Sequence, residues 1–156
     1  MPDYDLLVLG GGTGGYAAAF RAAQLGKRVG LVEQAKVGGT CLHWGCIPAK
    51  AMLESGDLLA KIGKAADHGI QIAPATGIDT TVVGARRDKI VAKMHAGLKS
   101  LFKKNNVEVI AARGTIAAPG SIEVALVDES GAPTGEERTV TATDIVVATG
   151  SSVRTI

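Results

Sequence analysis

Two short apolar runs near the N-terminus, separated by a glycine-rich stretch and an alanine-rich stretch, dominate the first part of the chain. The runs are Leu6–Leu9 and Val29–Glu33, and such runs are typical of parallel strands buried on both faces. Between them, Tyr16–Leu25 contains no helix breaker and is followed by Gly26, which suits the left-handed turn at the end of a helix. This pattern predicts a β-loop-α-β unit of roughly thirty residues.

The middle of the chain has helical patterns. Asp88–Lys104 is the clearest, because its apolar residues form one stripe at a 3.6-residue period and lysines stand near its C-terminal end, where the helix dipole favours them. The stripe consists of Ile90, Val91, Met94, Leu98, Leu101 and Phe102. Ala49–Ala66 also has helical composition, and Gly69–Thr81 is predicted to be a loop.

From Val107 onward the pattern changes to that of strands. We predict strands at Val107–Ala111, Ile122–Val127, Thr139–Ala142 and Ile145–Ala148, with a turn at residues 131–135. The chain is therefore predicted to have an α/β fold, with a Rossmann-like parallel sheet, helices and a small antiparallel β-meander.

Composition and charge narrow the class of protein. The 156 residues match the usual length of one domain, and 46% hydrophobic with 21% charged residues is enough for a core and a soluble surface. The net charge is only +2 and no basic run stands out, which argues against nucleic-acid and membrane-surface partners. No apolar stretch approaches the ~20 residues of a membrane span, and the N-terminus lacks the order of a signal peptide. We expect a cytoplasmic protein.

The first motif with chemical meaning is Gly10-x-Gly12-x-x-Gly15, between the first predicted strand and helix. Its glycines permit a tight turn, close approach of the backbone to a pyrophosphate, and close packing of helix on strand. Glu33 ends the second strand, where a carboxylate accepts a hydrogen bond from a ribose hydroxyl and repels a 2′-phosphate. The motif predicts dinucleotide binding and disfavours NADP at this site; the alternative is a plain glycine-rich turn.

The second motif contains both cysteines of the chain, Cys41 and Cys46. A bridge between them closes a ring of six residues, which stabilises a fold by only ~2 kcal/mol on the chain-entropy estimate. A redox dithiol is the favoured interpretation, with Gly45 allowing a distorted turn and Lys50 lowering a thiolate pKa or lying beside a flavin. Two alternatives remain: buried structural thiols, or a zinc site with His43 that needs a fourth ligand.

Together these motifs resemble the pyridine nucleotide–disulfide oxidoreductases, and in particular the branch that oxidises dihydrolipoamide. The resemblance covers the whole chain in order: the glycine turn, Glu33, the segment GGTCLHWGCIPAK at residues 38–50, and ATGS at residues 148–151. It implies that residues 1–156 are the N-terminal FAD-binding domain of such an enzyme. Ile47, where other branches more often have valine, also favours the dihydrolipoamide branch.

The resemblance also implies roles for individual residues. Catalytic roles fall to Cys41 as the interchange thiol, Cys46 as the thiolate beside the flavin, and Lys50 near its N5 atom. The implied cofactor-binding residues are Gly10, Gly12, Gly15, Glu33, Gly39, Thr40, Cys41, Lys50, Gly114, Ala148, Thr149 and Gly150. No metal site is implied.

The family pattern extends beyond this chain. Members have a second nucleotide-binding fold for NAD and an interface domain that forms a homodimer, and their dithiol substrate is dihydrolipoamide on the lipoyl domain of a 2-oxo acid dehydrogenase complex. The alternatives are another disulfide or mercuric-ion reductase of the same family, or a dinucleotide-binding fragment with inert thiols. His43-Trp44 replaces the family's commoner Asn-Val. His43 is either a proton-handling group beside Cys41 or a solvent-facing side chain. His68 and His95 are expected to face solvent.

Overall fold

At the N-terminus, strands and a helix alternate as the apolar pattern predicts. The computed structural model describes residues 1–73, 77–152 and 154. The helices within these described residues are α1 (Thr13–Gln24), α2 (Gly39–His43), α3 (Cys46–Gly63), the 3₁₀ helix η1 (Ala65–His68) and α4 (Thr80–Lys104). The strands are β1 (Tyr4–Leu9), β2 (Val29–Glu33), β3 (Glu108–Ala118), β4 (Ser121–Val127) and β5 (Pro133–Val147).

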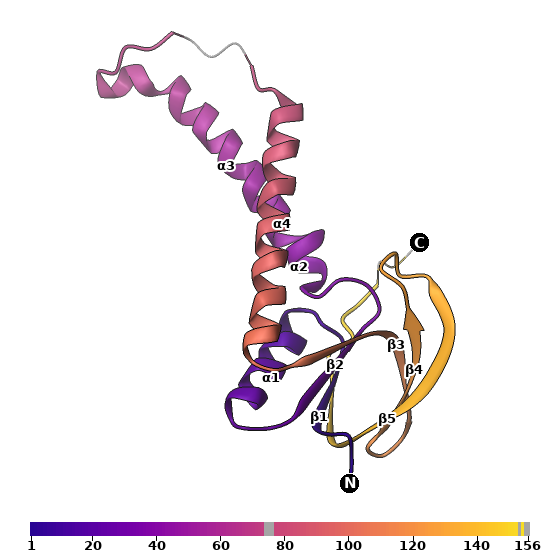
Figure 1. Cartoon of the computed structure of the whole chain (residues 1–156). Helices are drawn as coiled ribbons and strands as arrows, with labels where there is room; N and C mark the ends of the chain where they lie inside the picture. The colour runs from indigo at the N-terminus through magenta and orange to yellow at the C-terminus, as the bar shows by residue number, and fades with distance from the viewer. Residues whose placement is uncertain (74–76, 153, 155–156) are drawn as a thin grey trace. The chain divides into compact units, whose positions relative to one another are not determined.

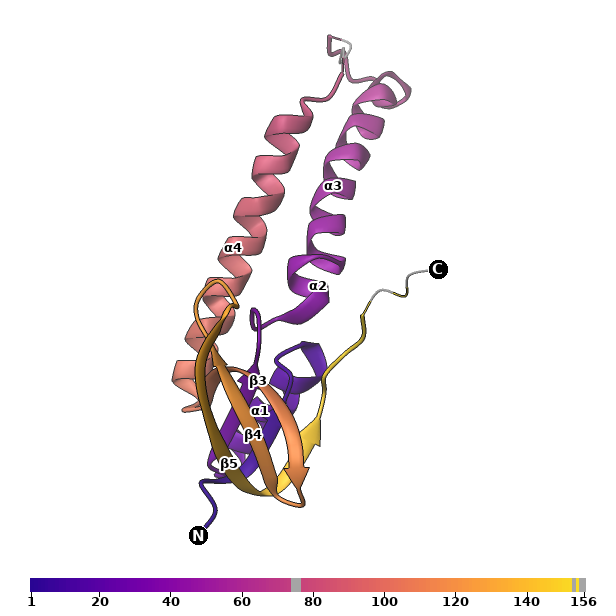
Figure 2. The ribbon, with the colours of Figure 1, turned by 90° about the vertical axis from the view of Figure 1, so that its right-hand side faces the viewer.

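The chain divides into two units. We call residues Met1–Gly39 and Ala96–Ile156 the strand unit, and residues Thr40–His95 the helical unit. The helical unit contains α3, η1 and the first part of α4, with α3 and α4 running in opposite directions (Figure 2). All the strands described above belong to the strand unit.

The sheet of the strand unit is both parallel and antiparallel. β1 pairs in parallel with β2 and with β5, and β2 pairs in parallel with β3. β4 pairs antiparallel with β3 and with β5, which gives the predicted meander. Because β3 and β5 take part in both kinds of pairing, the described strands close into a ring (Figure 1). The α/β class, the parallel pairs and the meander are confirmed, whereas the closure was not predicted.

The core of the strand unit follows from alternation along the strands. Leu7 and Leu9 of β1 belong to the main buried cluster, together with Ile122 and Val124 of β4. Val8 is fully buried on the other face of β1, toward α1, which packs against β1 and β2 (Figure 1). β1 is therefore buried on both faces, which explains its uninterrupted apolar sequence.

Several predicted boundaries were wrong. β3 continues to Ala118 rather than ending at Ala111, and α3 begins at Cys46 rather than Ala49. Thr139–Ala142 and Ile145–Ala148 are parts of one strand, β5, in which the pairing partner changes from β4 to β1 near residue 142. The predicted turn at 131–135 lies slightly earlier, because Pro133 already begins β5. The long helix begins at Thr80 rather than Asp88. Its first N–H groups, those of Thr81 and Val82, donate to the Asp79 carboxylate at 2.9 and 3.1 Å, so Asp79 caps the helix.

The predicted apolar stripe on α4 is only partly buried. Leu98 and Phe102 are in the core, and the Phe102 ring lies 4.8 Å from that of Phe20 on α1. Met94 and Leu101 are 49% and 45% exposed. The period of the stripe correctly predicts a helix, but the packing around each position decides its burial.

Candidate functional site

Gly10 and Gly15 are required by backbone packing in the turn after β1. Gly10 has a φ of +105°, and a Cβ there would collide with the Ala148 carbonyl oxygen. A Cβ at Gly15 would collide with the Gly10 carbonyl oxygen. Strand, turn and helix can approach this closely only with glycine at both positions.

Gly12 has a different environment, because a Cβ there would meet no atom within 4 Å. Gly12 is the N-cap residue of α1, and in this described stretch neither a capping side chain nor an acidic residue satisfies the first N–H groups of the helix. Free N–H groups and the positive end of a helix dipole attract anions. The open space and the uncapped helix start together fit a phosphate group.

Glu33 is held in a fixed orientation by the backbone. Its Oε2 accepts a hydrogen bond from the Gly11 N–H at 2.7 Å, and its Oε1 accepts one from the Ala35 N–H at 2.8 Å. Each carboxylate oxygen can accept a second hydrogen bond, so Glu33 keeps capacity for a ribose hydroxyl. A Cβ at Gly11 would lie 3.1 Å from Glu33 Oε2. The sequence motif gave no role to Gly11, although it lies between two of the motif glycines.

Several predicted residues line one cavity of about 280 Å³ in the strand unit. Gly10, Glu33, Gly114 and Thr149 are among them, and they come from the ends of β1 and β2, from β3 and from the segment after β5. Gln34 and Arg113 also line this cavity but were not predicted as site residues. We call it the nucleotide cavity, because it adjoins the glycine turn.

The structure gives Gly114 a packing explanation. A Cβ at Gly114 would lie 2.5 Å from Leu9 Cδ1 and 3.1 Å from Ile122 Cγ2, so the position must be glycine to fit the core. The end of β5 is fixed beside the same turn, because the Ala148 N–H donates to the Leu9 carbonyl at 2.8 Å. Gly150 follows with a φ of +74°.

Gly39 lies against the glycine turn. Its φ is +60°, and a Cβ there would lie 2.7 Å from Gly12 Cα. The preceding Gly38 N–H donates to the Gly11 carbonyl at 2.8 Å. The structure therefore brings Gly39 together with Gly12, although 27 positions separate them in the sequence.

The two cysteines stand on either side of a sharp bend in the helical unit. Cys41 lies in α2, and Cys46 is the first residue of α3. The bend is tight, because the Trp44 N–H donates to the Thr40 carbonyl at 2.9 Å and a Cβ at Gly45 would lie 3.0 Å from the same oxygen. Both cysteines are free thiols; Cys41 is half-buried and Cys46 is exposed.

The two thiols interact with each other. The hydrogen bond between their side chains is the main factor that raises the pKa of the Cys41 thiol, and burial raises it further. Lys50, one turn along α3 from Cys46, opposes this effect weakly through its positive charge. Cys41 therefore retains its proton to higher pH than an ordinary cysteine.

Arg86 contributes a contact that the sequence did not predict. Its Nη1 donates to the Ala51 carbonyl at 2.7 Å, which ties α4 to α3 immediately after Lys50. Ala51 is buried. No pattern in the sequence pairs these residues, because 35 positions separate them.

His43, given above as either a proton-handling group or a solvent-facing side chain, and His95, expected to face solvent, are only partly exposed. Both are half-buried, and their rings meet edge to face with centroids 4.9 Å apart. The Trp44 ring lies 5.4 Å from that of His43 and is 66% exposed. His68 is exposed, as expected.

The predicted site residues fall in both units. The strand unit holds the glycine turn, Glu33, Gly39, Gly114 and residues 148–150, and the helical unit holds Thr40, Cys41, Cys46 and Lys50.

Among the residues that the structure describes, no three His, Cys, Asp or Glu side chains form a group that could hold a metal ion. No helix in the described ranges is long and apolar enough to cross a membrane.

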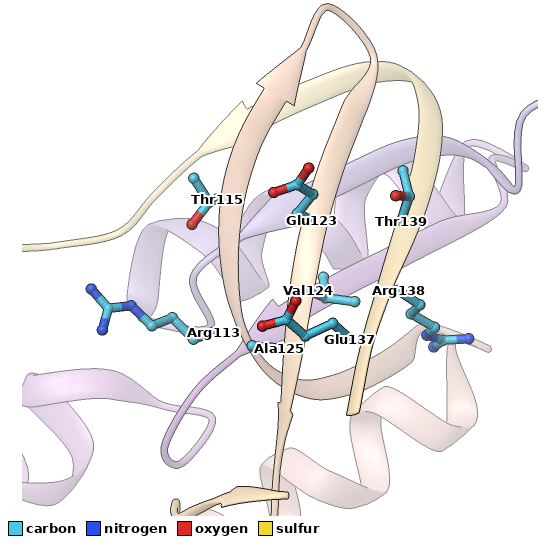
Figure 3. Close-up of a pocket in the computed structure, with 8 residues that line it drawn as sticks. All are labelled: Arg113, Thr115, Glu123, Val124, Ala125, Glu137, Arg138 and Thr139. Carbon is cyan, nitrogen blue, oxygen red and sulfur yellow. The ribbon is translucent and has the colours of Figure 1, made fainter. Parts of the chain in front are cut away.

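A second hollow of about 290 Å³ lies on the outer face of the meander. Figure 3 shows it lined by charged and polar side chains together with Val124 and Ala125, and the Arg113 side chain is directed away from the others. Arg113 lines this hollow and also the nucleotide cavity. The residues predicted to bind the cofactor do not line this second hollow.

The fold is of the α/β, Rossmann-like class. Residues 4–156 match the pyridine nucleotide-disulphide oxidoreductase family, and the chain belongs to this family. It is 40% identical to dihydrolipoyl dehydrogenases of Zymomonas mobilis, over 152 residues, and Bacillus subtilis, over 160 residues. It is 36% identical to the mitochondrial dihydrolipoyl dehydrogenase of Pisum sativum over 156 residues.

These alignments cover 97% to 99% of the chain but only 30% to 32% of the relatives. The chain therefore spans about a third of the length of the curated relatives that it matches.

Proposed function

We propose that residues 1–156 form the FAD-binding, dithiol-carrying part of a flavoprotein that oxidises dihydrolipoamide to lipoamide with NAD as acceptor. The observation that carries the proposal is the placement of two free thiols on either side of one tight bend, Cys41 in α2 and Cys46 at the start of α3. The pair occurs in a chain 36–40% identical to proteins named dihydrolipoyl dehydrogenase. The dithiol substrate, NAD and the whole reaction are proposed for the complete protein.

The strand unit fits the adenosine diphosphate half of FAD. Gly12 leaves open space at the uncapped start of α1, where the pyrophosphate would bind. Glu33 would accept a hydrogen bond from the ribose, since two backbone N–H groups already fix its carboxylate. Gly114 and Thr149 would line the cavity around the nucleotide. Gly39, Thr40 and Lys50 are proposed to contact the flavin half, by resemblance to the family.

The proposed thiol chemistry is a two-step exchange that starts from a Cys41–Cys46 disulfide. A substrate thiolate attacks the sulfur of Cys41, so a substrate–Cys41 disulfide forms and Cys46 leaves as a thiolate. The second substrate thiol, as a thiolate, attacks the substrate sulfur of that bond, which yields the cyclic disulfide product and releases Cys41. The substrate has then lost two electrons, which the cysteine pair holds, and two protons, of which one is taken up by Cys41 and the other is released to solvent. FAD, held by the glycine turn and Glu33, would supply the two-electron redox chemistry that links the cysteine pair to NAD.

The electrostatics of the pair suit this order of events. Cys46 begins an 18-residue helix without an acidic residue in its first turn, and the positive end of a helix dipole favours negative charge there. Cys41, whose pKa is raised, would retain its proton. The further parts of the protein would supply NAD binding and a homodimer interface. The partner would be the lipoyl domain of a 2-oxo acid dehydrogenase complex.

The test is an assay of the complete protein with dihydrolipoamide and NAD. We expect NADH formation that requires FAD and that is abolished by Cys41→Ser and by Cys46→Ser. Trp44→Phe, which leaves both thiols in place, serves as a control and should retain activity. Absence of turnover by the FAD-loaded protein would overturn the proposed substrate.

Two other functions are distinguished by related measurements. Turnover with glutathione disulfide or Hg(II), and none with dihydrolipoamide, would indicate another reductase of the same family. Nucleotide binding with no reduction of the cysteine pair by dihydrolipoamide would indicate a non-catalytic dinucleotide-binding fragment with inert thiols. The exposure of Cys46 favours the reactive alternative.

A further inference from the structure

Arg113 lines the nucleotide cavity, although no sequence motif includes it. The register of the sheet explains its position. Ala111 of β3 is the partner of Glu33 at the end of β2, and Arg113 follows two residues later. Side chains two apart on a strand lie on the same face. Arg113 and Glu33 therefore both border the nucleotide cavity from the same face of neighbouring strands.

The guanidinium of Arg113 is available to a ligand. Its neighbour Glu33 uses its two carboxylate oxygens to hold the N–H groups of Gly11 and Ala35, and within the described residues no ion pair joins Glu33 to Arg113. Figure 3 shows the Arg113 side chain directed away from Glu123 and Glu137 of the outer hollow. The acidic groups near it on the meander are thus not its partners in this structure.

The order of groups from the start of α1, beside Gly10 of the cavity, to the cavity wall points to the ligand atoms that Arg113 meets. The open space at Gly12 adjoins the start of α1, which suits phosphate, and Glu33 follows with a carboxylate that suits ribose. Arg113 borders the same cavity from the next strand. In a nucleotide the base is the group beyond the ribose, and a guanidinium plane stacks favourably on an aromatic ring.

We propose that Arg113 is a nucleotide-positioning residue whose guanidinium stacks on the adenine ring of the bound dinucleotide. The proposal rests on the proposed binding of FAD in this cavity. The stacking contact would add a side-chain interaction with the base, to which Gly114 can offer only its backbone atoms. Cation–π stacking at an exposed site predicts a loss of about 2- to 5-fold in affinity when the guanidinium is removed.

The experiment is calorimetric titration of the 156-residue chain with ADP and with FAD, which share the adenosine diphosphate group. Arg113→Met removes the charge and the plane, and we expect it to weaken binding of both ligands by about 2- to 5-fold. Arg113→Lys retains the charge without the plane and should recover little of the loss. Arg138→Met is the matched control, because Arg138 lines the outer hollow and not the nucleotide cavity. Its affinities should equal those of the wild type.

Three results would overturn the inference. Equal binding by the wild type and Arg113→Met would remove Arg113 from the site while leaving the proposed function intact. Full recovery by Arg113→Lys, with affinity that falls steeply as salt is added, would assign Arg113 to the phosphates instead of the base. Wild-type chain that binds neither FAD nor ADP would contradict both this inference and the proposed cofactor site. Circular dichroism of each variant shows whether a loss reflects folding.

Discussion

At the scale of single residues, the motif glycines do not all serve the same purpose. Gly10, Gly15 and Gly39 are glycine because a Cβ would strike backbone, whereas Gly12 faces open space. Only the second kind of position is free to accommodate a ligand. Spacing in the sequence groups these glycines together, but only the contacts separate the positions fixed by packing from the position with open space.

This difference leads to a prediction for Gly12→Ala. The variant should fold, with at most about 1 kcal/mol lost because alanine is a poorer N-cap than glycine. Its affinity for FAD should fall at least about tenfold, because the methyl group occupies the space proposed for the pyrophosphate. Fluorescence titration with FAD and a thermal melt measure the two effects.

Gly14→Ala is the matched control, since a Cβ at Gly14 also meets no atom within 4 Å but lies inside α1. It should bind FAD like the wild type and should be as stable or slightly more stable. If Gly12→Ala retains wild-type affinity, the start of α1 is not the pyrophosphate site.

The raised pKa of Cys41 gives a second prediction at this scale. Only the thiolate is alkylated, so the rate of Cys41 alkylation should rise at higher pH than for an ordinary cysteine. Cys46→Ala removes the main cause of the shift, so the midpoint should move to lower pH and alkylation at neutral pH should become faster. The measurement is the iodoacetamide rate against pH, read on the Cys41 peptide by mass spectrometry.

The substitution Lys50→Met should shift the pKa of Cys41 in the direction opposite to that of Cys46→Ala. Lys50 lowers the pKa of Cys41 by its charge, so its removal should move the midpoint to higher pH. The shift should be the smaller of the two, since this charge is the weakest of the causes. A Cys46→Ala profile that coincides with that of the wild type would show that the two thiols do not interact.

At the scale of elements, helix ends and helix contacts were predicted less well than helix existence. The start of α4 was missed because Thr80–Gly84 contains β-branched residues and a glycine, which are poor helix formers. The Asp79 cap offsets this, and it is a signal that the sequence contains. The contact between Arg86 and Ala51 has no comparable local signal.

Arg86→Met tests that contact. The Ala51 carbonyl would lose its charged donor, and we expect the helical unit to lose about 1–2 kcal/mol of stability. Faster hydrogen exchange at the amides of α3, near Ala51, is the expected result. Arg87→Met is the control, because Arg87 pairs with its exposed neighbour Asp88 and such surface pairs contribute little. Equal exchange in both variants would show that Arg86 does not hold α3.

At the scale of the whole molecule, the pairing of distant strands determines the strand unit. β5 pairs with β4 along its first part and with β1 along its last part, and β3 likewise changes from β2 to β4. A polar stretch, Thr143-Asp144, lies within β5 and suggested a break, but the strand continues because both of its parts are paired. Closure of the ring thus joins what the sequence pattern treats as a sheet and a separate meander.

The sequence by itself determined the local features of this protein. Apolar runs, glycine spacing and the paired cysteines predict the β-loop-α-β unit, the acidic end of β2 and the dithiol, because each depends on residues close together in the chain. The tertiary structure decided the rest: the closed ring, the core packing at Gly114, the position of Arg113 beside Glu33, and the contact of Arg86 with Ala51. These features join segments far apart in sequence, and their energies depend on which surfaces meet when the chain packs, which no local pattern records.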